Sequence, residues 1–194
     1  MTTPDAHLVE TKISSEEVLR GNFLKVRRDI VALPDGKQTT REYIVHPGAV
    51  MIIAQLDDGR YVMERQFRYP VGAVMVEFPA GKLDAGEDVL ACAKRELFEE
   101  TGYTAREWAR AGVLHPVISY STEFIDIWFA RGLVKGERQL DAGEFLDVFA
   151  ATPLELIGMC AAGQITDAKT LTGTLWMQNV LSGAWSLDWQ AAAA

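Results

Sequence analysis

Short apolar stretches, separated by turn residues, organise the first eighty residues of the chain. Residues 22–33 and 38–45 are rich in β-branched and apolar positions, and a Pro-Asp-Gly-Lys turn signal lies between them. We therefore expect an antiparallel hairpin here. Residues 48–56 form a dense apolar run, which is typical of a buried central strand. Two more strands are predicted over residues 60–68 and 73–78.

A helical pattern follows at residues 88–101, where Val89, Ala93 and Leu97 recur on one face. Gly102 stands where helices commonly end in a glycine. After this helix the strand pattern returns. The strands predicted there cover residues 108–119, 125–133 and 145–149.

Two helices complete the pattern. Thr152 and Pro153 form an N-cap followed by a proline at the first helical position, which predicts a helix that ends near Gly163. Asp167 predicts the start of a last helix. Its apolar positions are Leu171, Leu175 and Val180. The order of strands, helix, strands and two helices predicts an α/β or α+β sandwich with a mixed sheet.

The chain is expected to have two parts without an obvious linker between them. Residues 1–47 are predicted to form a lead-in and the hairpin, and residues 48–190 a single compact domain. Within the first part, residues 1–13 are predicted to be a loose lead-in and residues 14–17 carry a weak capping signal for a turn. Residues 191–194 are expected to be a frayed tail.

Charge and cysteine content narrow the possible functions. The formal net charge is −8, which argues against a nucleic-acid-binding surface but still allows a polyphosphate substrate held through a divalent metal ion. Cys92 and Cys160 form no CxxC pair, and neither a signal-peptide pattern nor a membrane-length apolar run is present. We therefore expect a cytoplasmic protein with no membrane or nucleic-acid partner.

Three glutamates crowd one part of the predicted helix. Glu96 and Glu100 are four residues apart and share a face, with Glu99 beside them. Their repulsion at the negative end of the helix dipole disfavours this arrangement unless a cation lies among them, and carboxylate oxygens suit Mg²⁺ or Mn²⁺. The alternative is a solvated acidic face, which is common on helices. Arg95 within the run and Gly81 in the turn before the helix weigh against that alternative.

The spacing of these residues resembles the Nudix box, which is a glycine, five residues, a glutamate, seven residues and then Arg-Glu-aliphatic-any-Glu-Glu-any-Gly-aliphatic. The matching positions are Gly81, Glu87, Arg95, Glu96, Leu97, Glu99, Glu100 and Gly102. Tyr103 is the one departure, since an aliphatic residue is usual there. The resemblance covers residues 81–103, and the strand order around them is also similar to the α/β/α sandwich of the family.

This resemblance implies a hydrolase that cleaves the diphosphate of a nucleoside-diphosphate derivative. The implied cofactor is Mg²⁺ or Mn²⁺, with more than one ion bound. The implied metal ligands are the carbonyl of Ala80 and the carboxylates of Glu96, Glu99 and Glu100, and of these Glu100 is also expected to be essential for catalysis. The residues expected to shape the site are Gly81, Glu87, Arg95 and Gly102.

Outside the box, the chain resembles the ADP-ribose pyrophosphatase branch of this family. The segments that carry the resemblance are residues 39–43, 64–68, 77–81 and 167–170. The branch implies hydrolysis of ADP-ribose to AMP and ribose 5-phosphate by a homodimer that pairs or swaps its N-terminal strands. The alternative is that the hairpin only extends one sheet. The implied substrate-binding residues are Arg41, Arg68 and Glu77.

The general base in that branch comes from a mobile acidic loop. Glu144, just before the strand at 145–149, is one candidate, and Glu123 is the other. Residues 118–122 lack the glycine pair of the branch, which leaves room for nucleoside diphosphate sugars as the alternative substrates. A third hypothesis, a non-catalytic nucleotide-binding module, is disfavoured because all three box glutamates of the helix are present.

Overall fold

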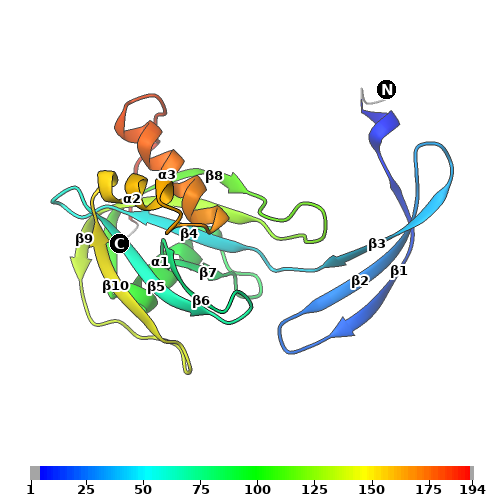
Figure 1. Cartoon of the computed structure of the whole chain (residues 1–194), viewed down its shortest axis with the longest axis horizontal. Coiled ribbons are helices and arrows are strands. Elements are labelled where there is room, and N and C mark those ends of the chain that lie inside the picture. The colour runs from blue at the N-terminus through cyan, green and yellow to red at the C-terminus, as the bar shows by residue number, and fades with distance from the viewer. Residues whose placement is uncertain (1–4, 193–194) are drawn as a thin grey trace. The chain divides into compact units, whose positions relative to one another are not determined.

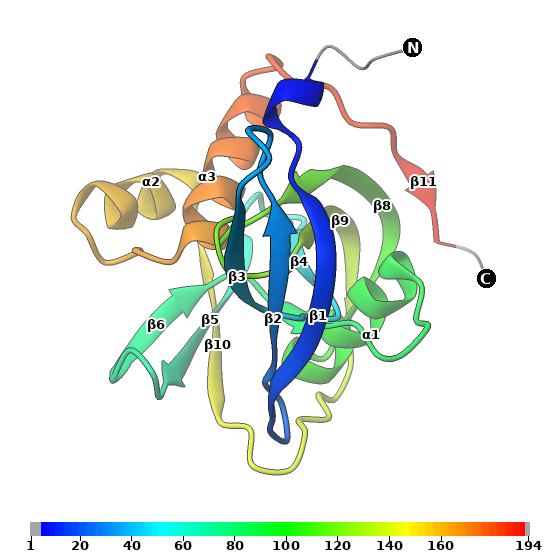
Figure 2. The ribbon, with the colours of Figure 1, turned by 90° about the vertical axis from the view of Figure 1, so that its right-hand side faces the viewer.

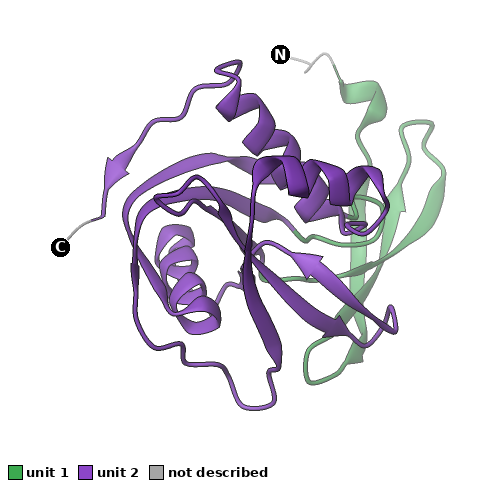
Figure 3. Ribbon diagram, turned by 60° about the vertical axis from the view of Figure 1, so that its left-hand side comes forward, with its two compact units in different colours: residues 1–47, 117–123 green, residues 48–116, 124–194 purple. Residues whose placement is uncertain are grey.

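The computed structural model describes residues 5–192 and divides the chain into two compact units (Figure 3). The first unit contains the chain up to residue 47 together with residues 117–123. The second contains residues 48–116 and the chain from residue 124 onward. Residues 1–4, the start of the predicted lead-in, and residues 193–194, the end of the predicted tail, lie outside the described residues.

The first unit is a three-stranded antiparallel sheet, in which β2 lies between β1 and β3 (Figure 2). Its elements are the 3₁₀ turn η1 (Ala6–Leu8), β1 (Thr11–Arg20), β2 (Lys25–Ala32) and β3 (Gln38–Ile44). The segment 117–123 joins the end of β3 through backbone bonds. Ile44 N–H donates to the Tyr120 carbonyl at 2.8 Å, and Thr122 N–H donates to the Ile44 carbonyl at 3.0 Å.

The hairpin predicted from the sequence is present as β2 and β3. The loose lead-in predicted over residues 1–13 is wrong for residues 11–13, and the turn predicted at residues 14–17 is wrong. Residues 11–20 form a third strand. The register of β1 against β2 shifts between Lys12 and Ser14 and again between Glu17 and Leu19. These bulges break the two-residue alternation of apolar positions, which is the signal by which a strand is recognised in a sequence.

The second unit contains two sheets (Figure 1). The larger one is mixed, because β4 and β9 are parallel while its other pairs are antiparallel. Its strands in spatial order are β11 (Gln190–Ala191), β8 (Tyr103–Leu114), β9 (Ile125–Lys135), β4 (Ala49–Ala54) and β7 (Ala80–Lys82). The smaller sheet is antiparallel. Its strands in spatial order are β10 (Leu146–Ala151), β5 (Tyr61–Arg68) and β6 (Ala73–Glu77).

The three helices of this unit are α1 (Val89–Thr101), α2 (Pro153–Ala161) and α3 (Ala168–Leu181). Strand alternation in β4 separates two apolar clusters. Val50 and Ile52 pack in a cluster with α1, whereas Met51 and Ile53 pack in a cluster that contains side chains of α2 and α3. The expected α/β/α sandwich with a mixed sheet is therefore confirmed. No helix within residues 5–192 is long and apolar enough to cross a membrane.

The helix starts follow the sequence signals, but the buried face of α3 does not. Leu171 and Leu175, predicted as apolar contacts, are 40% and 51% exposed. The buried positions are Thr170, Gly173, Thr174 and Met177. Small residues allow α3 to approach the sheet closely, and Trp176 and the predicted apolar residue Val180 pack against the same core.

The C-terminal segment is paired rather than frayed as far as residue 192. Gln190 lies opposite Trp108 of β8, and Ala192 N–H donates to the Arg106 carbonyl at 2.7 Å. The guanidinium carbon of Arg131 lies 4.0 Å from the ring centroid of Trp189, which supplies a cation–π contact to the same edge. The frayed tail predicted over residues 191–194 is therefore wrong for residues 191 and 192.

Candidate active site

Helix α1 carries the glutamates of the box, and both of its ends are fixed. The Asp88 carboxylate accepts hydrogen bonds from Leu90 N–H at 2.9 Å and from Ala91 N–H at 3.1 Å. Gly102 has φ 74°, and its N–H donates to the Phe98 carbonyl. Because only glycine adopts this left-handed conformation readily, the helix ends at Thr101, one residue after the last box glutamate.

Arg95 braces the acidic run from within. Its guanidinium donates to both oxygens of Glu87 at 2.8 Å, to Glu96 at 2.8 Å and to Glu99 at 3.0 Å. The hydrogen bond from Arg95 lowers the pKa of Glu87 to about 2. The structure thus places Glu87 and Arg95 together in one ion-pair network that joins the loop to the helix.

Glu100 is the most enclosed acid of the helix, with only 4% of the residue exposed. Its Oε2 accepts a hydrogen bond from Ala80 N–H at 3.0 Å, so the predicted ligands Glu100 and Ala80 lie in contact. Burial, followed by the charges of Glu64, Glu96 and Glu144, raises the pKa of Glu100 well above its usual value.

Glu96 lies against the glycine that opens the box. A methyl group placed on Gly81 would collide with the Glu96 carboxylate, so the absence of a side chain at 81 makes room for that carboxylate. The Glu96 side chain is 13% exposed, and burial raises the pKa of Glu96 although Arg95 opposes this shift. The solvated acidic face that the sequence left open is therefore not what α1 presents at Glu96 and Glu100.

Glu64 in β5 is a member of this acidic group to which sequence reasoning assigned no role. Only 3% of the residue is exposed, and its Oε1 has no hydrogen-bond partner within residues 5–192. Burial, followed by the charges of Glu144 and Glu77, raises the pKa of Glu64 to about 8. A sequence signal existed, since Glu64 directly follows the apolar start of a strand, where a charged side chain is costly.

Arg68 and Glu77, both predicted substrate-binding residues, form an ion pair on neighbouring strands of the smaller sheet. Arg68 donates to the two Glu77 oxygens at 2.7 and 2.8 Å. Lys169 at the start of α3 also donates to Glu77, and to Asp167 at 2.9 Å. Burial alone would raise the pKa of Glu77, but Arg68 and Lys169 lower it. Lys169 is a second residue of this region to which sequence reasoning gave no role.

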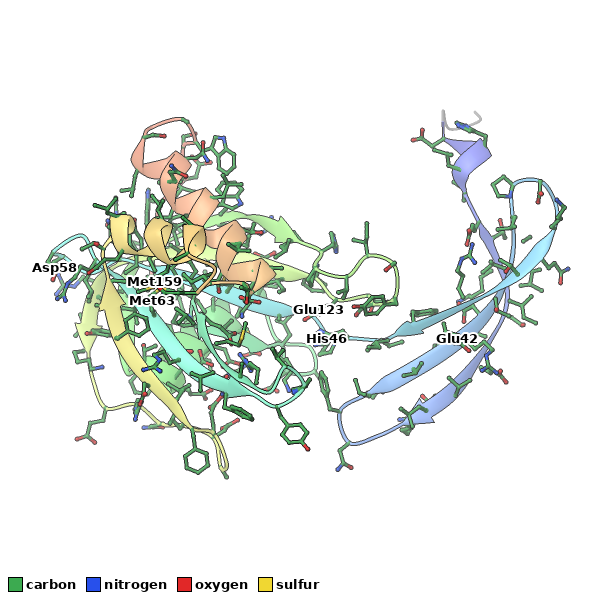
Figure 4. The ribbon with its side chains drawn as sticks, in the orientation of Figure 1. Glu42, His46, Asp58, Met63, Glu123 and Met159 are labelled. Atoms are coloured by element: carbon green, nitrogen blue, oxygen red, sulfur yellow. The ribbon has the colours of Figure 1, made fainter. Side chains whose placement is uncertain are left out.

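The two candidates for the general base lie in different units. Glu144 belongs to the second unit, where its charge acts on Glu64, Glu96 and Glu100, and Gln66 Nε2 donates to it at 3.4 Å. Glu123 belongs to the first unit, where its Oε1 lies 3.7 Å from His46 Nε2 (Figure 4). Within the second unit, Glu144 therefore lies near the box glutamates.

Arg41, the third predicted substrate contact, lies in β3 of the first unit. Its guanidinium donates to the two Glu10 oxygens at 2.5 and 3.0 Å. Both side chains are partly exposed, at 46% and 34%. The role of Arg41 in substrate binding stays a prediction.

The residues gathered around α1 suit a divalent cation by their chemistry. Glu64, Glu96 and Glu100 supply carboxylates, Glu64 Oε1 lacks a hydrogen-bond partner within residues 5–192, and the charges of these carboxylates repel one another. Among residues 5–192, however, no three His, Cys, Asp or Glu side chains already form a converging ligand set. Arg95 donates hydrogen bonds to Glu96 and Glu99, so a cation that binds these two carboxylates competes with this arginine.

The protein is an α/β/α sandwich with buried carboxylates on one helix, a combination that suits a divalent cation. The profile of the NUDIX domain matches residues 45–172. The chain therefore belongs to the Nudix family, and it is a metal-dependent hydrolase of that family. A second profile, the nucleoside diphosphate sugar hydrolase N-terminal domain, matches residues 10–44.

Relatives with similar sequences extend over most of the chain. An ADP-ribose pyrophosphatase of Bacillus subtilis is 35% identical over 88% of this chain and 94% of its own length. An ADP-ribose pyrophosphatase of Mycobacterium tuberculosis is 36% identical over 91% and 86%, and a methanol dehydrogenase activator of Bacillus methanolicus is 38% identical over 87% and 92%. A crystal structure of an ADP compounds hydrolase has a TM-score of 0.81 at 22% identity, covering 90% of this chain and 95% of that one, which supports the fold.

Proposed function

We propose that the protein hydrolyses the diphosphate of ADP-ribose, giving AMP and ribose 5-phosphate. The observation that carries this proposal is the 35% identity to the Bacillus subtilis ADP-ribose pyrophosphatase, which extends over 94% of that enzyme. One water molecule is consumed, the bond between the bridging oxygen and one phosphorus breaks, and both products are phosphate monoesters. The intact box glutamates argue against the alternative of a non-catalytic nucleotide-binding module.

We assign metal binding to Glu96, Glu99, Glu100 and the Ala80 carbonyl, with Mg²⁺ or Mn²⁺ as the cation and more than one ion bound. When bound, such ions neutralise the diphosphate and activate water. Glu144 is our choice for the group that accepts a proton from the attacking water, because its charge already acts on the buried carboxylates.

Arg41, Arg68 and Glu77 are proposed to bind the substrate, with Arg68 held in place by Glu77. A planar guanidinium that donates several hydrogen bonds suits phosphate and ribose oxygens. Glu123 remains the second candidate for the base, and its test is paired with that of Glu144 below.

The enzyme proposal is tested by incubating the purified chain with ADP-ribose and Mg²⁺, and measuring AMP and ribose 5-phosphate. The Glu100→Gln variant is the matched control and should lose activity by orders of magnitude while its circular dichroism spectrum stays unchanged. Absence of hydrolysis from a panel of diphosphate compounds, with Mg²⁺ and with Mn²⁺, would refute the proposal.

A second candidate is the hydrolysis of nucleoside diphosphate sugars. It is favoured by the match of residues 10–44 to the nucleoside diphosphate sugar hydrolase N-terminal domain, and by the lack of a glycine pair in residues 118–122. The same panel separates the two candidates, since cleavage of sugar nucleotides without cleavage of ADP-ribose would establish the second.

We further propose that the protein is a homodimer built through its first unit. Among the described residues of this unit, only Asp29 and Val31 are buried, and every residue of β1 is exposed. Ile13, Leu19 and Phe23 are about half exposed, at 52%, 48% and 50%. A three-stranded sheet needs an apolar face packed against something to be stable, and a second copy of the sheet supplies it.

Sedimentation equilibrium tests this assembly. The chain should sediment as a dimer at micromolar concentration, and Leu19→Glu should shift it toward the monomer. A wild-type chain that is monomeric throughout would contradict the proposal.

A cytoplasmic location is proposed on the separate ground that Cys92 and Cys160 are free thiols, and cell fractionation tests it.

A further inference from the structure

Glu64 lies on the face of the smaller sheet that is turned toward α1. Val62, two residues earlier in β5, packs in the apolar cluster that contains Cys92 and Leu97 of the helix. Since side chains two residues apart in a strand point to the same face, Glu64 points toward the same layer. Its direct neighbour in β10, Val148, packs against this cluster as well, which agrees with that orientation.

Among the described residues, no cation near Glu64 is free to neutralise it. Glu77 lies opposite Glu64 in β6. The negative charge of Glu144 raises the pKa of Glu64, and the negative charge of Glu64 raises the pKa of Glu100. Arg68 and Lys169 are the positive charges nearby, but both donate their hydrogen bonds to Glu77.

A buried carboxyl with an unpartnered oxygen is costly, and such groups occur where a ligand completes their bonding. The oxygen here is Glu64 Oε1, in a residue that is 3% exposed. Replacement by an apolar side chain of similar size would remove this cost if packing were the only function of the position.

We propose that Glu64 belongs to the divalent-cation site and that its Oε1 contributes to coordination of the cation, directly or through one water molecule of the hydration shell. The inference rests on the proposed metal-dependent function of the box glutamates and adds a carboxylate from β5 to those of α1. Mg²⁺ commonly keeps several of its water molecules in proteins, so an acid set back from the helix still reaches the coordinated shell.

The competing account is that Glu64 is only a buried, uncharged structural acid. The two accounts differ in their effect on cation affinity. A cation-binding Glu64 strengthens the binding of Mg²⁺ or Mn²⁺ to the folded chain. A structural Glu64 changes the stability of the metal-free chain and leaves the affinity unchanged.

The test is titration of the purified full-length chain with Mn²⁺, with free Mn²⁺ measured by electron paramagnetic resonance and heat by calorimetry. Glu64→Gln keeps the size of the side chain and removes its charge, and we expect it to weaken Mn²⁺ binding about 10- to 100-fold. Glu100→Gln is the positive comparator. Glu107→Gln is the matched control, because Glu107 is a partly exposed residue of β8 that pairs with Arg131. This variant should bind Mn²⁺ with wild-type affinity.

The outcomes are distinct. If Glu64→Gln binds Mn²⁺ within twofold of wild type while Glu100→Gln binds it weakly, the role of Glu64 is refuted and the proposed function stands. If the wild-type chain binds no divalent cation, the proposed function fails and this inference with it. Should Glu64→Gln not fold, Glu64→Asp replaces it. The shorter carboxylate should bind Mn²⁺ several-fold more weakly than wild type, and an unchanged affinity would overturn the inference.

Discussion

The Glu96 carboxylate packs directly against Gly81, and substitution of this glycine by alanine tests whether the close contact matters for activity. Gly81→Ala adds a single methyl group, which would collide with the carboxylate of Glu96. Gly81 is not among the glycines with a positive φ, so alanine introduces no backbone strain there. The three nearest atoms that the new methyl group would meet all belong to the Glu96 carboxylate, so we expect displacement of this carboxylate to be the main effect.

The size of the effect follows from the displacement. Ordinary van der Waals contact with a Cβ begins at 3.4 Å, and the Glu96 carboxylate lies well inside that limit. The carboxylate must therefore move by roughly 1 Å or more, and a shift of that size can lower a rate about 10²-fold. We expect kcat/KM for ADP-ribose to fall about 10²-fold, equivalent to ~2.7 kcal/mol of transition-state stabilisation.

The assay is AMP release at several Mg²⁺ concentrations, with thermal unfolding measured in parallel. Gly158→Ala in α2 is the control, since a methyl group added there meets nothing within 4 Å. This control should keep wild-type kcat/KM and gain about 0.5–1 kcal/mol of stability, because alanine favours helices more than glycine does. Wild-type kcat/KM and Mg²⁺ dependence in Gly81→Ala would refute the reasoning.

Two further predictions concern the base and the packing of α3. Glu144→Gln should lower kcat about 10²- to 10⁴-fold, while Glu123→Gln should lower it less; near-normal kcat in both variants would exclude both as the base. Gly173→Ala should destabilise the chain by about 1–3 kcal/mol despite a gain in helix propensity, because the new methyl group lies 2.8 Å from Met51 Cε and 2.9 Å from the Phe78 ring. Urea unfolding measures this, and an unchanged midpoint would contradict the packing argument.

The parts of the fold that were predicted correctly depend on local chemistry. Asp88, Thr152 and Asp167 are N-caps in the structure because an oxygen near the backbone N–H groups of the first turn stabilises a helix regardless of its tertiary contacts. The central strand β4 was predictable for a related reason, since all six of its residues are buried and an unbroken apolar run marks a strand covered on both faces.

The parts that were missed depend on tertiary contacts. The apolar residues of α3 suggested one face, but Gly173 and Thr174 are buried because small side chains allow close approach to the sheet. Glu64 belongs to no motif that a sequence search would recognise. Its buried, acidic surroundings are formed by strands and a helix that lie far away in sequence. Its fixed neighbours include Glu77, thirteen residues later, and Glu144, eighty residues later.

The distribution of positive charges predicts that the proposed metal ligands contribute unequally to the affinity for the cation. Arg95 compensates Glu96 and Glu99, so a cation that binds these two only replaces an existing ion pair. Glu100 has no ion pair in the described part of the chain, and its charge is both buried and repelled by neighbouring carboxylates. A bound cation therefore gains more from Glu100 than from Glu99, because the desolvation of Glu100 has already occurred on folding. Substitution of Glu100 should consequently weaken metal binding more than substitution of Glu99.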